Sequence, residues 1–577
     1  MKTILLGHDA LGRAVELTGQ ERETHMHVIG SSGSGKSKFL EQMMRGDLDN
    51  RQGFCLIDPH GSLYQDVLHY CSHKVLSREI VLLNLSEPAQ VIGFNPFKKA
   101  PEGDISVQVD GMIRAITRAW GMPNTDQTPT LERTLRLIFI TLVELGLPFH
   151  AAQHMLNFGS GEIRAQFIEK LSSPLIRREW EELLELRPKD WRAEMLSAKN
   201  RLLRLLTSET LARFFNTENG GIDLAEIIDK GKVLLVNLAT SPSLSDENGR
   251  VFGALLLNEF FHAARRRRAP PGKTLVPYYL YLDEFQTFVT LDVAGMLDQV
   301  RKYKVFAVLA HQRFGQLDED LTDAVLTNCR IKAVFGGLPV EMARMMAQEL
   351  FIGELDPMRI KVAIYQTKFW PKYGRDRVYT KSGSRGRSTG RGENIMSGES
   401  AASLQGQFFE AEAWYSGELV GTSMSATAGT SSASGNHWNE TDFEGQAEGE
   451  ADVPILIPVP FQELSSVQYF TFEEQLTQLT AALKGQFGRH CFIKIHHQKT
   501  QPLRVPLIRS HYTPEKSIAE YQTRKLAAEG AQTAAVVDEC IARQDEELRR
   551  AVTRAAKEPE VKSKEPPPSW GDLLGRE

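Results

Sequence analysis

The sequence predicts an α/β fold, in which helices flank a mostly parallel sheet and an all-α domain is inserted between its strands. Near-continuous apolar runs alternate with helical patterns in the first third of the chain and again between residues 230 and 350. Such runs are typical of strands that are buried on both faces of a parallel sheet. We expect these strands at His25–Gly30, Gly53–Asp58, Ile80–Leu85, Lys232–Leu238, Leu275–Asp283, Val305–Ala310 and Ile331–Phe335.

Between residues 104 and 220 the strand pattern disappears. Leu, Ile and Phe recur there at helical spacing, for example in Leu131–Leu145 and Trp191–Leu206, which predicts a separate domain of helices. After residue 380 the chain is rich in Gly, Ser and Thr and poor in aliphatic residues, which favours a flexible segment. We expect ordered structure to resume near Val453–Phe461 and a charged helix to form at Ile518–Ala556.

Length and composition set the broad class of the protein. The 577 residues correspond to roughly four domain units, and 41% hydrophobic with 24% charged residues is an ordinary globular composition. The formal net charge of −5 does not indicate a nucleic-acid binder, although a ring protein can concentrate basic residues on one surface without changing the sum. The five cysteines lack metal-binding spacing and are expected to be reduced thiols.

No part of the sequence predicts a membrane segment. The N-terminal residues lack the apolar run of a signal peptide, and the chain nowhere reaches the ~18 consecutive apolar residues that a spanning helix needs. We therefore expect a cytoplasmic protein without direct membrane insertion, and we leave open a peripheral association with the inner membrane.

The strongest motif is a phosphate-binding loop at residues 30–37. It fits G-x-x-x-x-G-K-[ST], follows a predicted strand and precedes a helix expected at Phe39–Met44. Its glycines let backbone N–H groups point at phosphates, and the helix N-terminus adds partial positive charge. Lys36 is expected to reach the β- and γ-phosphates of ATP, and Ser37 is expected to bind Mg²⁺. The predicted nucleotide-binding residues are Gly30, Ser31, Ser32, Gly33, Ser34, Gly35, Lys36, Ser37 and Lys38.

Two later strands end in residues suited to ATP hydrolysis. Asp283 and Glu284 follow the strand that ends at Leu282, so we expect Asp283 to hold Mg²⁺ and Glu284 to polarise the attacking water. Gln312 follows the next strand, within reach of the γ-phosphate, and is expected to report whether ATP or ADP is bound. His311 beside it is expected to be structural.

Three basic or polar groups have alternative interpretations. Arg301 either completes a neighbouring subunit's site in a ring or is a cation at a helix C-terminus. Asp58 and His60 either lie near the nucleotide or cap a turn. The run Arg265–Arg268 either faces DNA or ends a solvated helix.

These features divide the chain into six expected regions. They are the first part of the P-loop NTPase core (1–103), the all-α insertion (104–220), the second part of the core (221–376), a Gly/Ser-rich flexible segment (377–450), a C-terminal α+β extension (451–512), and a charged helix with a disordered tail (513–577).

Several motifs, taken in order, resemble one protein family. They are HVIGSSGSGKS, LIDPHG, FNPF, LLVNL, YLDEFQTF and VLAHQ, and they flank the helical insertion. The set resembles the coupling-protein ATPases of type IV secretion and conjugation, within the HerA/FtsK superfamily of P-loop motor proteins. The resemblance covers residues 20–350. It departs from typical coupling proteins, which begin with transmembrane helices, and from typical HerA proteins, which carry a small domain before the P-loop.

The resemblance implies a RecA-like P-loop core and a homo-oligomer, most simply a hexameric ring that hydrolyses ATP and moves DNA through its pore. It implies that Arg301 acts in trans and that the all-α domain faces DNA and partners such as a relaxase or secretion-channel subunits. We therefore expect a DNA translocase for conjugative transfer. The alternatives are a HerA-like translocase that works with a nuclease in repair or anti-phage defence, an ATPase that powers protein secretion without DNA, and a nucleotide-dependent assembly switch with negligible turnover, against which Glu284 argues.

Overall fold

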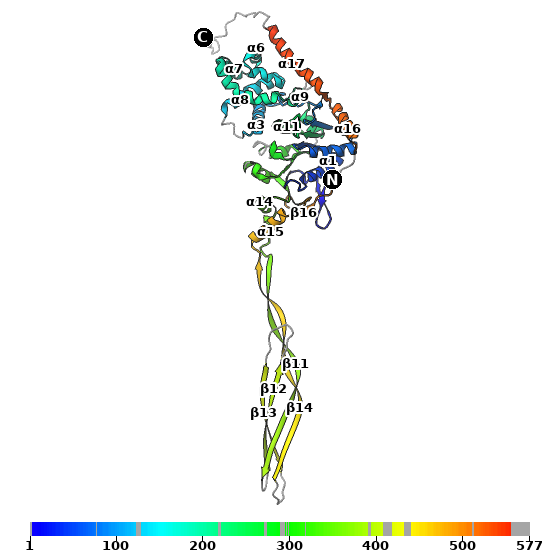
Figure 1. The fold of residues 1–577 in the computed structure, drawn as a ribbon, viewed down its shortest axis with the longest axis vertical. Coiled ribbons are helices and arrows are strands. Elements are labelled where there is room, and N and C mark those ends of the chain that lie inside the picture. Colours follow the sequence, from blue (N-terminus) through cyan, green and yellow to red (C-terminus); the bar gives the residue numbers. More distant parts are fainter. Residues whose placement is uncertain are drawn as a thin grey trace. The chain divides into compact units, whose positions relative to one another are not determined.

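The computed structural model describes most of the chain and divides it into two compact units. The described residues are 3–76, 78–122, 128–216, 221–269, 274–288, 295, 297, 299–317, 319–389, 394–407, 418–431, 440–509 and 513–555. Unit 1 comprises Met1–Leu355 with Phe472–Glu577, and unit 2 comprises Asp356–Thr471. The ribbon is shown in Figure 1.

Unit 1 is built on an eleven-stranded sheet with the order β2-β1-β16-β15-β10-β3-β9-β8-β4-β7-β5. The seven strands from β10 to β5 are parallel, and every residue of the six from β3 to β5 in this order is buried. Their bounds are β3 His25–Ile29, β4 Gly53–Asp58, β5 Ile80–Asn84, β7 Val233–Asn237, β8 Tyr278–Leu282, β9 Val305–His311 and β10 Cys329–Phe335. The expected strands and the expected α/β fold with a mostly parallel sheet are thereby confirmed.

Helices α1 (Lys36–Asp49) and α2 (Ser62–His73) follow β3 and β4. A buried polar cluster fixes α1 on the sheet: Asp47 of α1 accepts hydrogen bonds from Arg22, at 3.0 Å, and from the Tyr281 hydroxyl of β8, at 2.6 Å. The Arg22 guanidinium also lies over the ring of Tyr279. Because α1 begins at the phosphate-binding loop, this cluster holds the loop in place relative to β8.

The sheet is extended by antiparallel strands from both ends of the chain. Strands β1 (Thr3–His8) and β2 (Ala14–Thr18) form a hairpin, and β15 (His490–Ile495) and β16 (Gln501–Arg504) form another. β15 pairs with β10, and β16 pairs with β1. The expectation of a C-terminal extension over 451–512 is therefore wrong for these strands. They complete the central sheet because β10 offers a free edge beside β3.

Helices fill the chain between β5 and β7 after a short strand, β6 (Gln90–Val91). Trp180 and Trp191 are fully buried among them. The Trp180 indole donates to the Thr141 hydroxyl at 3.1 Å, which joins two of these helices. The elements are α3 Ile105–Ala119, α4 Pro129–Leu145, η2 Phe149–Ala151, α5 Ala152–Leu156, η3 Phe158–Ser160, α6 Gly161–Lys170, α7 Pro174–Leu184, α8 Pro188–Leu206 and α9 Glu209–Phe215.

The remaining helices of unit 1 pack on the sheet or beside it (Figure 1). A single charged helix was expected at Ile518–Ala556, but α16 and α17 are separate because Gly530, at φ 74°, breaks the helix and β17 pairs with β6. The bounds of these remaining helices and of the short strand β17 are α10 Leu224–Asp229, α11 Asp246–Arg266, η4 Phe285–Thr287, η5 Arg301–Tyr303, η6 Phe314–Gln316, α13 Glu319–Asn328, α14 Val340–Phe351, η7 Ile352–Glu354, α15 Phe472–Lys484, α16 Glu515–Ala528, β17 Gln532–Thr533 and α17 Ala534–Ala555.

Helix α17 packs against the helical insertion. Arg213 of α9 donates through two nitrogens to Asp538, at 2.8 Å each, and His154 of α5 lies 3.1 Å from Asp545. The sequence prediction of a charged helix and disordered tail over 513–577 did not include this docking. The residues predicted as tail, 557–577, lie outside the described residues.

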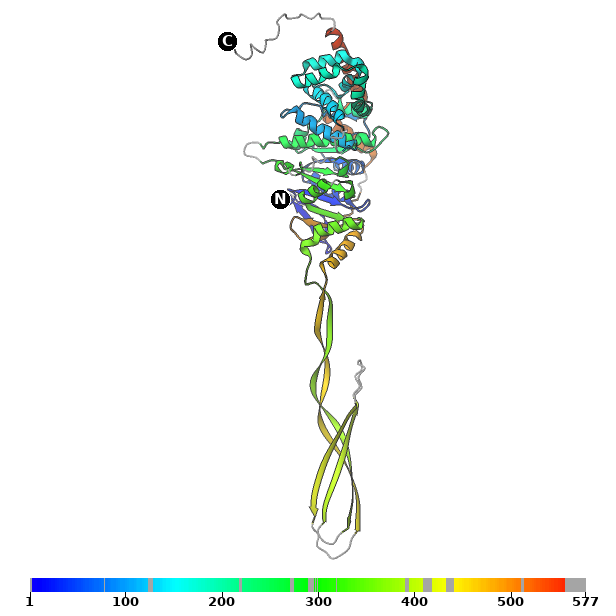
Figure 2. The ribbon, with the colours of Figure 1, turned by 90° about the vertical axis from the view of Figure 1, so that its left-hand side faces the viewer.

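Unit 2 is a long antiparallel ribbon of β11 (Ile360–Thr389) and β14 (Glu440–Tyr469), paired from Ile360 with Tyr469 to Thr389 with Glu440, with register shifts between Ile360 and Val362 and between Ile364 and Tyr365. Figure 2 shows the two strands twisting about each other. Strands β12 (Asn394–Gln407) and β13 (Glu418–Ser431) form a second pair. The expectation of a flexible segment over 377–450 is therefore wrong for the residues that form these strands. Composition does not reveal a backbone ladder whose partner strand lies far along the chain.

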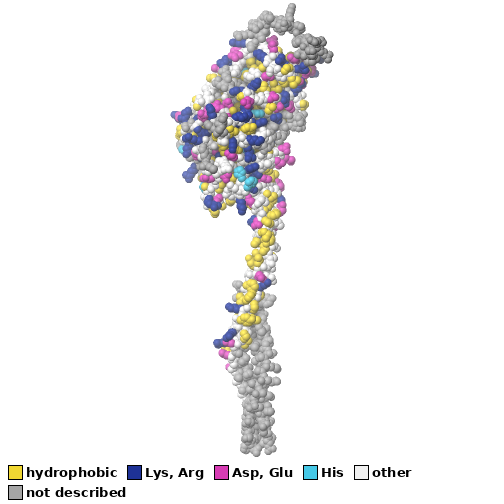
Figure 3. Space-filling view, turned by 180° about the vertical axis from the view of Figure 1, so that it is seen from behind, with side chains coloured by type: hydrophobic (Ala, Val, Ile, Leu, Met, Phe, Trp, Pro, Cys, Tyr) yellow, Lys and Arg dark blue, Asp and Glu magenta, His cyan; other side chains and the backbone are white. Residues whose placement is uncertain are grey.

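Part of the ribbon carries exposed apolar side chains, which Figure 3 shows as a yellow band. Trp370 and Tyr373 are 69% and 82% exposed, and Phe461 on the partner strand contacts the ring of Trp370.

No helix in the described part of the chain is both long enough and apolar enough to cross a membrane.

Candidate nucleotide-hydrolysis site

The phosphate-binding loop lies between β3 and α1, at the carboxyl edge of the parallel sheet. Gly33 and Gly35 have φ angles of 74° and 111°, in the left-handed region that favours glycine. Gly30 is required for close packing, because a Cβ there would lie 2.5 Å from the Cβ of Phe335 on β10. These glycines allow the loop to adopt its compact conformation. The N–H groups at the N-terminus of α1 point toward the space above the loop.

Lys36 lies in the interior of the loop and is 5% exposed. Its ammonium donates to the carbonyl oxygens of Gly30 and Ser31, at 2.7 and 3.1 Å. Burial lowers the pKa of Lys36, and the nearby Glu284 and Asp283 carboxylates oppose that shift. The cation is therefore placed beside the acidic pair.

Asp283 follows β8 and faces the loop. Its Oδ2 accepts a hydrogen bond from the Ser37 hydroxyl at 3.4 Å, and the side chain is almost fully buried. Burial, with the charges of Asp58 and Glu284, raises the pKa of Asp283 to about 6. Mg²⁺ at nucleotide sites binds one or two protein oxygens with phosphates and waters, so this hydroxyl–carboxylate pair fits the ion. Among the described residues, no group of three or more His, Cys, Asp or Glu forms a further metal site.

Glu284 adopts a strained backbone conformation, with φ 46° and ψ 53° in the left-handed region. Its N–H donates to Asp283 Oδ1 at 3.1 Å. Its two carboxylate oxygens accept from the side-chain amides of Gln312 and Gln286, at 2.6 and 2.7 Å. Two amide donors therefore fix the position of the Glu284 carboxylate beside Asp283.

Gln312 follows β9, which lies between β3 and β8 in the sheet. The strand before it is tied to the loop strand by a buried histidine pair, His27 Nε2 and His311 Nε2, 2.7 Å apart. His311 Nδ1 donates to the Arg313 carbonyl at 3.2 Å, so its Nε2 accepts from His27. Burial lowers the pKa of His311 to about 4, which keeps it neutral. The pair is structural and couples the position of Gln312 to that of the loop strand.

We predict that Asp283→Asn stabilises the nucleotide-free protein at pH 8. Because the pKa of Asp283 is raised to about 6 in the folded protein, its ionised form is disfavoured by about 3 kcal/mol above that pH. This cost is small near pH 4, where the folded carboxyl is protonated and the unfolded carboxyl is about half protonated. Thermal unfolding without Mg²⁺ is expected to show a higher Tm for Asp283→Asn at pH 8 and a much smaller difference in Tm at pH 4.

The matched control for this prediction is Asp190→Asn, at an exposed position on α8. It is expected to change Tm little at either pH. A Tm for Asp283→Asn below that of the wild type at pH 8 would show that the ionised carboxylate stabilises the fold and would contradict the raised pKa.

Arg301 is not brought to this site within its own chain. It lies in η5, before β9, whereas Gln312 follows the opposite end of that strand. The seven-residue strand separates them by about 23 Å. The expected helix Leu291–Tyr303 is described only in part, and its last residues form a 3₁₀ turn. A role of Arg301 at an ATP site therefore requires a neighbouring copy.

Asp58 and Lys38 have protein partners in the structure. Asp58 accepts from the backbone N–H groups of His60 and Tyr64, at 2.8 and 2.9 Å, so it caps the turn into α2 while its charge acts on Asp283. Lys38 pairs with Glu41 and Asp66, at 2.8 and 2.6 Å.

The four-arginine run is not uniformly solvated. Arg267 is 3% exposed and contacts Asp229 at 2.8 Å, and it also donates to the carbonyls of Tyr303 and Val276. These contacts hold the end of α11 against the segments that precede β8 and β9, so this arginine is structural.

Sequence reasoning missed two residues beside the site. Gln286 was quoted within YLDEFQTF without a role, and only the η4 turn reveals that its amide reaches Glu284. Arg489 lies far along the chain, yet its N–H donates to the Ser34 carbonyl at 2.8 Å. No local pattern signals a contact between such distant segments.

The sequence matches one protein family, described as the TraM recognition site of TraD and TraG, over residues 277–404. This segment includes β8, the Asp283–Glu284 pair, β9 and Gln312. Over these residues the chain is similar to that family. The match covers less than half of the sequence, and no curated protein matches the chain.

Among solved structures, the chain is similar to the bacterial conjugative coupling protein TrwB lacking its N-terminal 70 residues. The identity is 12%, the alignment covers 88% of this chain and 90% of that chain, and the TM-score is 0.47. For TrwB in complex with the ATP analogue ADPNP the values are 13%, 86%, 88% and 0.48. For VirB4 of Thermoanaerobacter pseudethanolicus they are 14%, 60%, 87% and 0.39.

Proposed function

We propose that this chain is an ATP-hydrolysing ring motor that moves DNA during conjugative transfer through a type IV secretion system. The observation that carries the ATPase part is the Glu284 carboxylate, held by two glutamine amides beside Asp283 and the phosphate-binding loop. A nucleotide-binding switch has no need of a carboxylate oriented in this way. Support for the coupling-protein part comes from the family match over residues 277–404.

In the proposed reaction, the loop N–H groups and Lys36 bind the phosphates of ATP. Ser37 and Asp283 hold Mg²⁺, which neutralises phosphate charge when it is bound. Glu284 accepts a proton from the water that attacks the γ-phosphate, and Gln312 keeps the carboxylate aimed at that water. Loss of the γ-phosphate changes what Gln312 contacts. Because Gln312 follows β9 directly, this change is passed to the segment after the strand.

The DNA part of the proposal rests on the coupling-protein resemblance. The helical insertion and α17 together form a surface that is separate from the nucleotide site, where we propose that DNA or protein partners such as a relaxase bind. Genes beside this one discriminate the alternatives: relaxase or secretion genes favour conjugation, whereas a nuclease gene favours repair or defence.

The experiment for DNA movement is displacement of an obstacle. With ATP and Mg²⁺, the protein is expected to displace streptavidin from biotinylated single-stranded DNA or a third strand from a triplex. Glu284→Gln is expected to displace neither. Active ATP hydrolysis with no displacement of either obstacle would contradict translocation and would favour a protein-secretion motor.

We predict that Arg301 acts on the site of a neighbouring subunit. Because Arg301 lies at the far end of β9 from its own Gln312, Arg301→Ala and Lys36→Ala impair different halves of a shared site. Each variant alone is expected to have little or no ATPase activity. A mixture of the two is expected to recover activity, because some interfaces then combine an intact arginine with an intact loop.

The control for the mixing experiment combines Lys36→Ala with Glu284→Gln, which both damage the loop side of the site. That mixture is expected to stay inactive if both residues belong to one subunit's half. Failure of the Arg301→Ala and Lys36→Ala mixture to exceed the sum of its components would count against a site built across an interface.

A further inference from the structure

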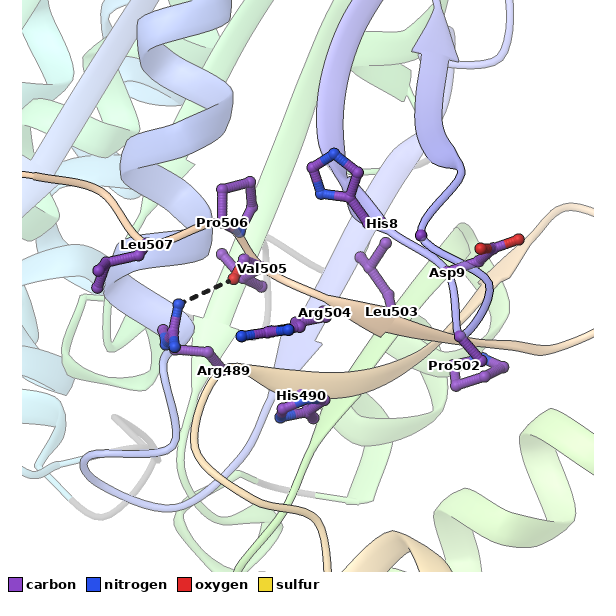
Figure 4. A pocket seen from close by; sticks show the side chains of 12 residues that line it. His8, Asp9, Arg489, His490, Pro502, Leu503, Arg504, Val505, Pro506 and Leu507 are labelled. Carbon is purple, nitrogen blue, oxygen red and sulfur yellow. Dashed lines mark hydrogen bonds between the residues drawn. The ribbon is translucent and has the colours of Figure 1, made fainter.

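A cavity of about 760 Å³ lies between the two hairpins that extend the sheet. Figure 4 shows its lining, which comes from the β1–β2 turn, the β15–β16 hairpin and the residues after β16. Arg489 and Arg504 supply guanidinium groups, and Leu503, Pro506 and Leu507 supply apolar surface. The Leu507 side chain is 68% exposed. The cavity therefore combines cationic and apolar groups without belonging to the hydrolysis site described above.

The cavity adjoins the phosphate-binding loop through Arg489. The Arg489 N–H donates to the Ser34 carbonyl at 2.8 Å, and a Cβ on Gly35 would lie 3.1 Å from the Cα and N of Arg489. Arg489 has a φ of 66°, in the left-handed region that a non-glycine residue adopts only when the surroundings fix it. Its guanidinium also contacts the Val505 carbonyl, at 3.5 Å. One residue thus links the loop with the wall of the cavity.

The sheet order gives the direction in which a bound nucleotide extends. Glu284 and Gln312 follow β8 and β9, on one side of the loop strand β3. The strands β10, β15 and β16 lie on the other side. A nucleotide whose γ-phosphate faces Glu284 and that extends along this end of the sheet directs its nucleoside toward β15 and β16. The cavity lies at that end.

We propose that this cavity binds the base and ribose of the nucleotide whose phosphates lie on residues 30–37. The inference rests on the proposed function and adds the nucleoside half of the same site. Arg504 pairs in register with His490 of β15 and with His8 of β1, which places its side chain on the same face of the sheet as theirs, and all three line the cavity. A guanidinium stacks on the face of a base, and Leu507 with Pro506 covers apolar base surface. Arg489, beside the loop, lies where the phosphates meet the ribose.

If the cavity binds the nucleoside, changes in its lining weaken the binding of ligands that have a nucleoside and leave the binding of ligands that lack one unchanged. The probes are a non-hydrolysable ATP analogue and inorganic tripolyphosphate, each with Mg²⁺, and calorimetry on the full chain measures both dissociation constants. The double variant Arg504→Lys with Leu507→Ala preserves charge while it removes the planar group and the apolar side chain. We expect it to weaken binding of the ATP analogue by about tenfold or more and to leave tripolyphosphate binding within about twofold.

Leu196→Ala, at an exposed leucine on α8, is the matched control and is expected to change neither constant. The single variant Leu507→Ala gives a second readout if the double variant unfolds, with a smaller loss for the ATP analogue alone. Equal affinity of wild type and variants for the ATP analogue would overturn the nucleoside assignment while leaving the ATPase proposal intact. Parallel loss of tripolyphosphate binding would overturn it too. A wild-type protein that binds neither probe would overturn both.

Discussion

Glu284→Gln is expected to lower the rate of ATP hydrolysis by about 10²–10⁴-fold while ATP still binds. Glutamine has the size of glutamate, but it cannot accept the proton of the attacking water. The amides of Gln312 and Gln286 now bind the two carboxylate oxygens, at 2.6 and 2.7 Å, so the change removes the base without emptying its position. ATP affinity is expected to be unchanged or higher, because one negative charge near the phosphates is lost. Steady-state turnover and equilibrium ATP binding measure the two effects separately.

Glu181→Gln, at an exposed position on α7, is the matched control and is expected to leave both quantities unchanged. Gln312→Ala provides an intermediate case, because it removes one of the two amides that orient Glu284 and leaves the carboxylate. Turnover of Glu284→Gln within about tenfold of the wild type would mean that the general base lies elsewhere.

Lys36→Ala is expected to weaken nucleotide binding by about 10–150-fold and to abolish turnover at ordinary ATP concentrations, since charge-assisted hydrogen bonds contribute about 1.5–3 kcal/mol. In the structure the Lys36 ammonium already satisfies the Gly30 and Ser31 carbonyls and lies beside two carboxylates. The variant loses the only positive charge placed inside the described loop. Calorimetry with the ATP analogue and with tripolyphosphate is expected to show loss of both ligands.

Lys230→Ala removes an exposed lysine paired with Glu226 on α10, and it is expected to keep wild-type affinity for both ligands. Because the control changes the net charge by the same amount, it separates local phosphate binding from long-range electrostatics. Unchanged ATPase activity in Lys36→Ala would contradict the assignment of the phosphate-binding loop.

The sequence was sufficient to predict the features that depend on short, local patterns. The strands β3, β4 and β8 are buried on both faces, so their sequences are near-continuous apolar runs and could be assigned as strands of a parallel sheet. The loop motif was predictable because each of its glycines serves a local backbone requirement, such as φ 111° at Gly35. Glu284 and Gln312 could be placed near each other because the ends of neighbouring parallel strands meet at one edge.

The parts that could not be predicted depend on pairing between distant segments. β15 joins β10 and β16 joins β1, which brings Arg489 against the loop, and no spacing rule links residues so far apart. The strand partner of β11 lies beyond two further strands, and a composition rich in Gly and Ser hid its ability to form a ladder. The docking of α17 depends on ion pairs such as Arg213 with Asp538, which a charged helix does not reveal by itself.

The most direct test of the account is the steady-state ATPase rate of the purified protein with and without single- and double-stranded DNA, at two salt concentrations. We predict that DNA stimulates hydrolysis and that the stimulation fades at high salt, because a protein that contacts phosphates releases counterions on binding. The same rate with and without either form of DNA at both salt concentrations would contradict the proposal that this ATPase moves DNA.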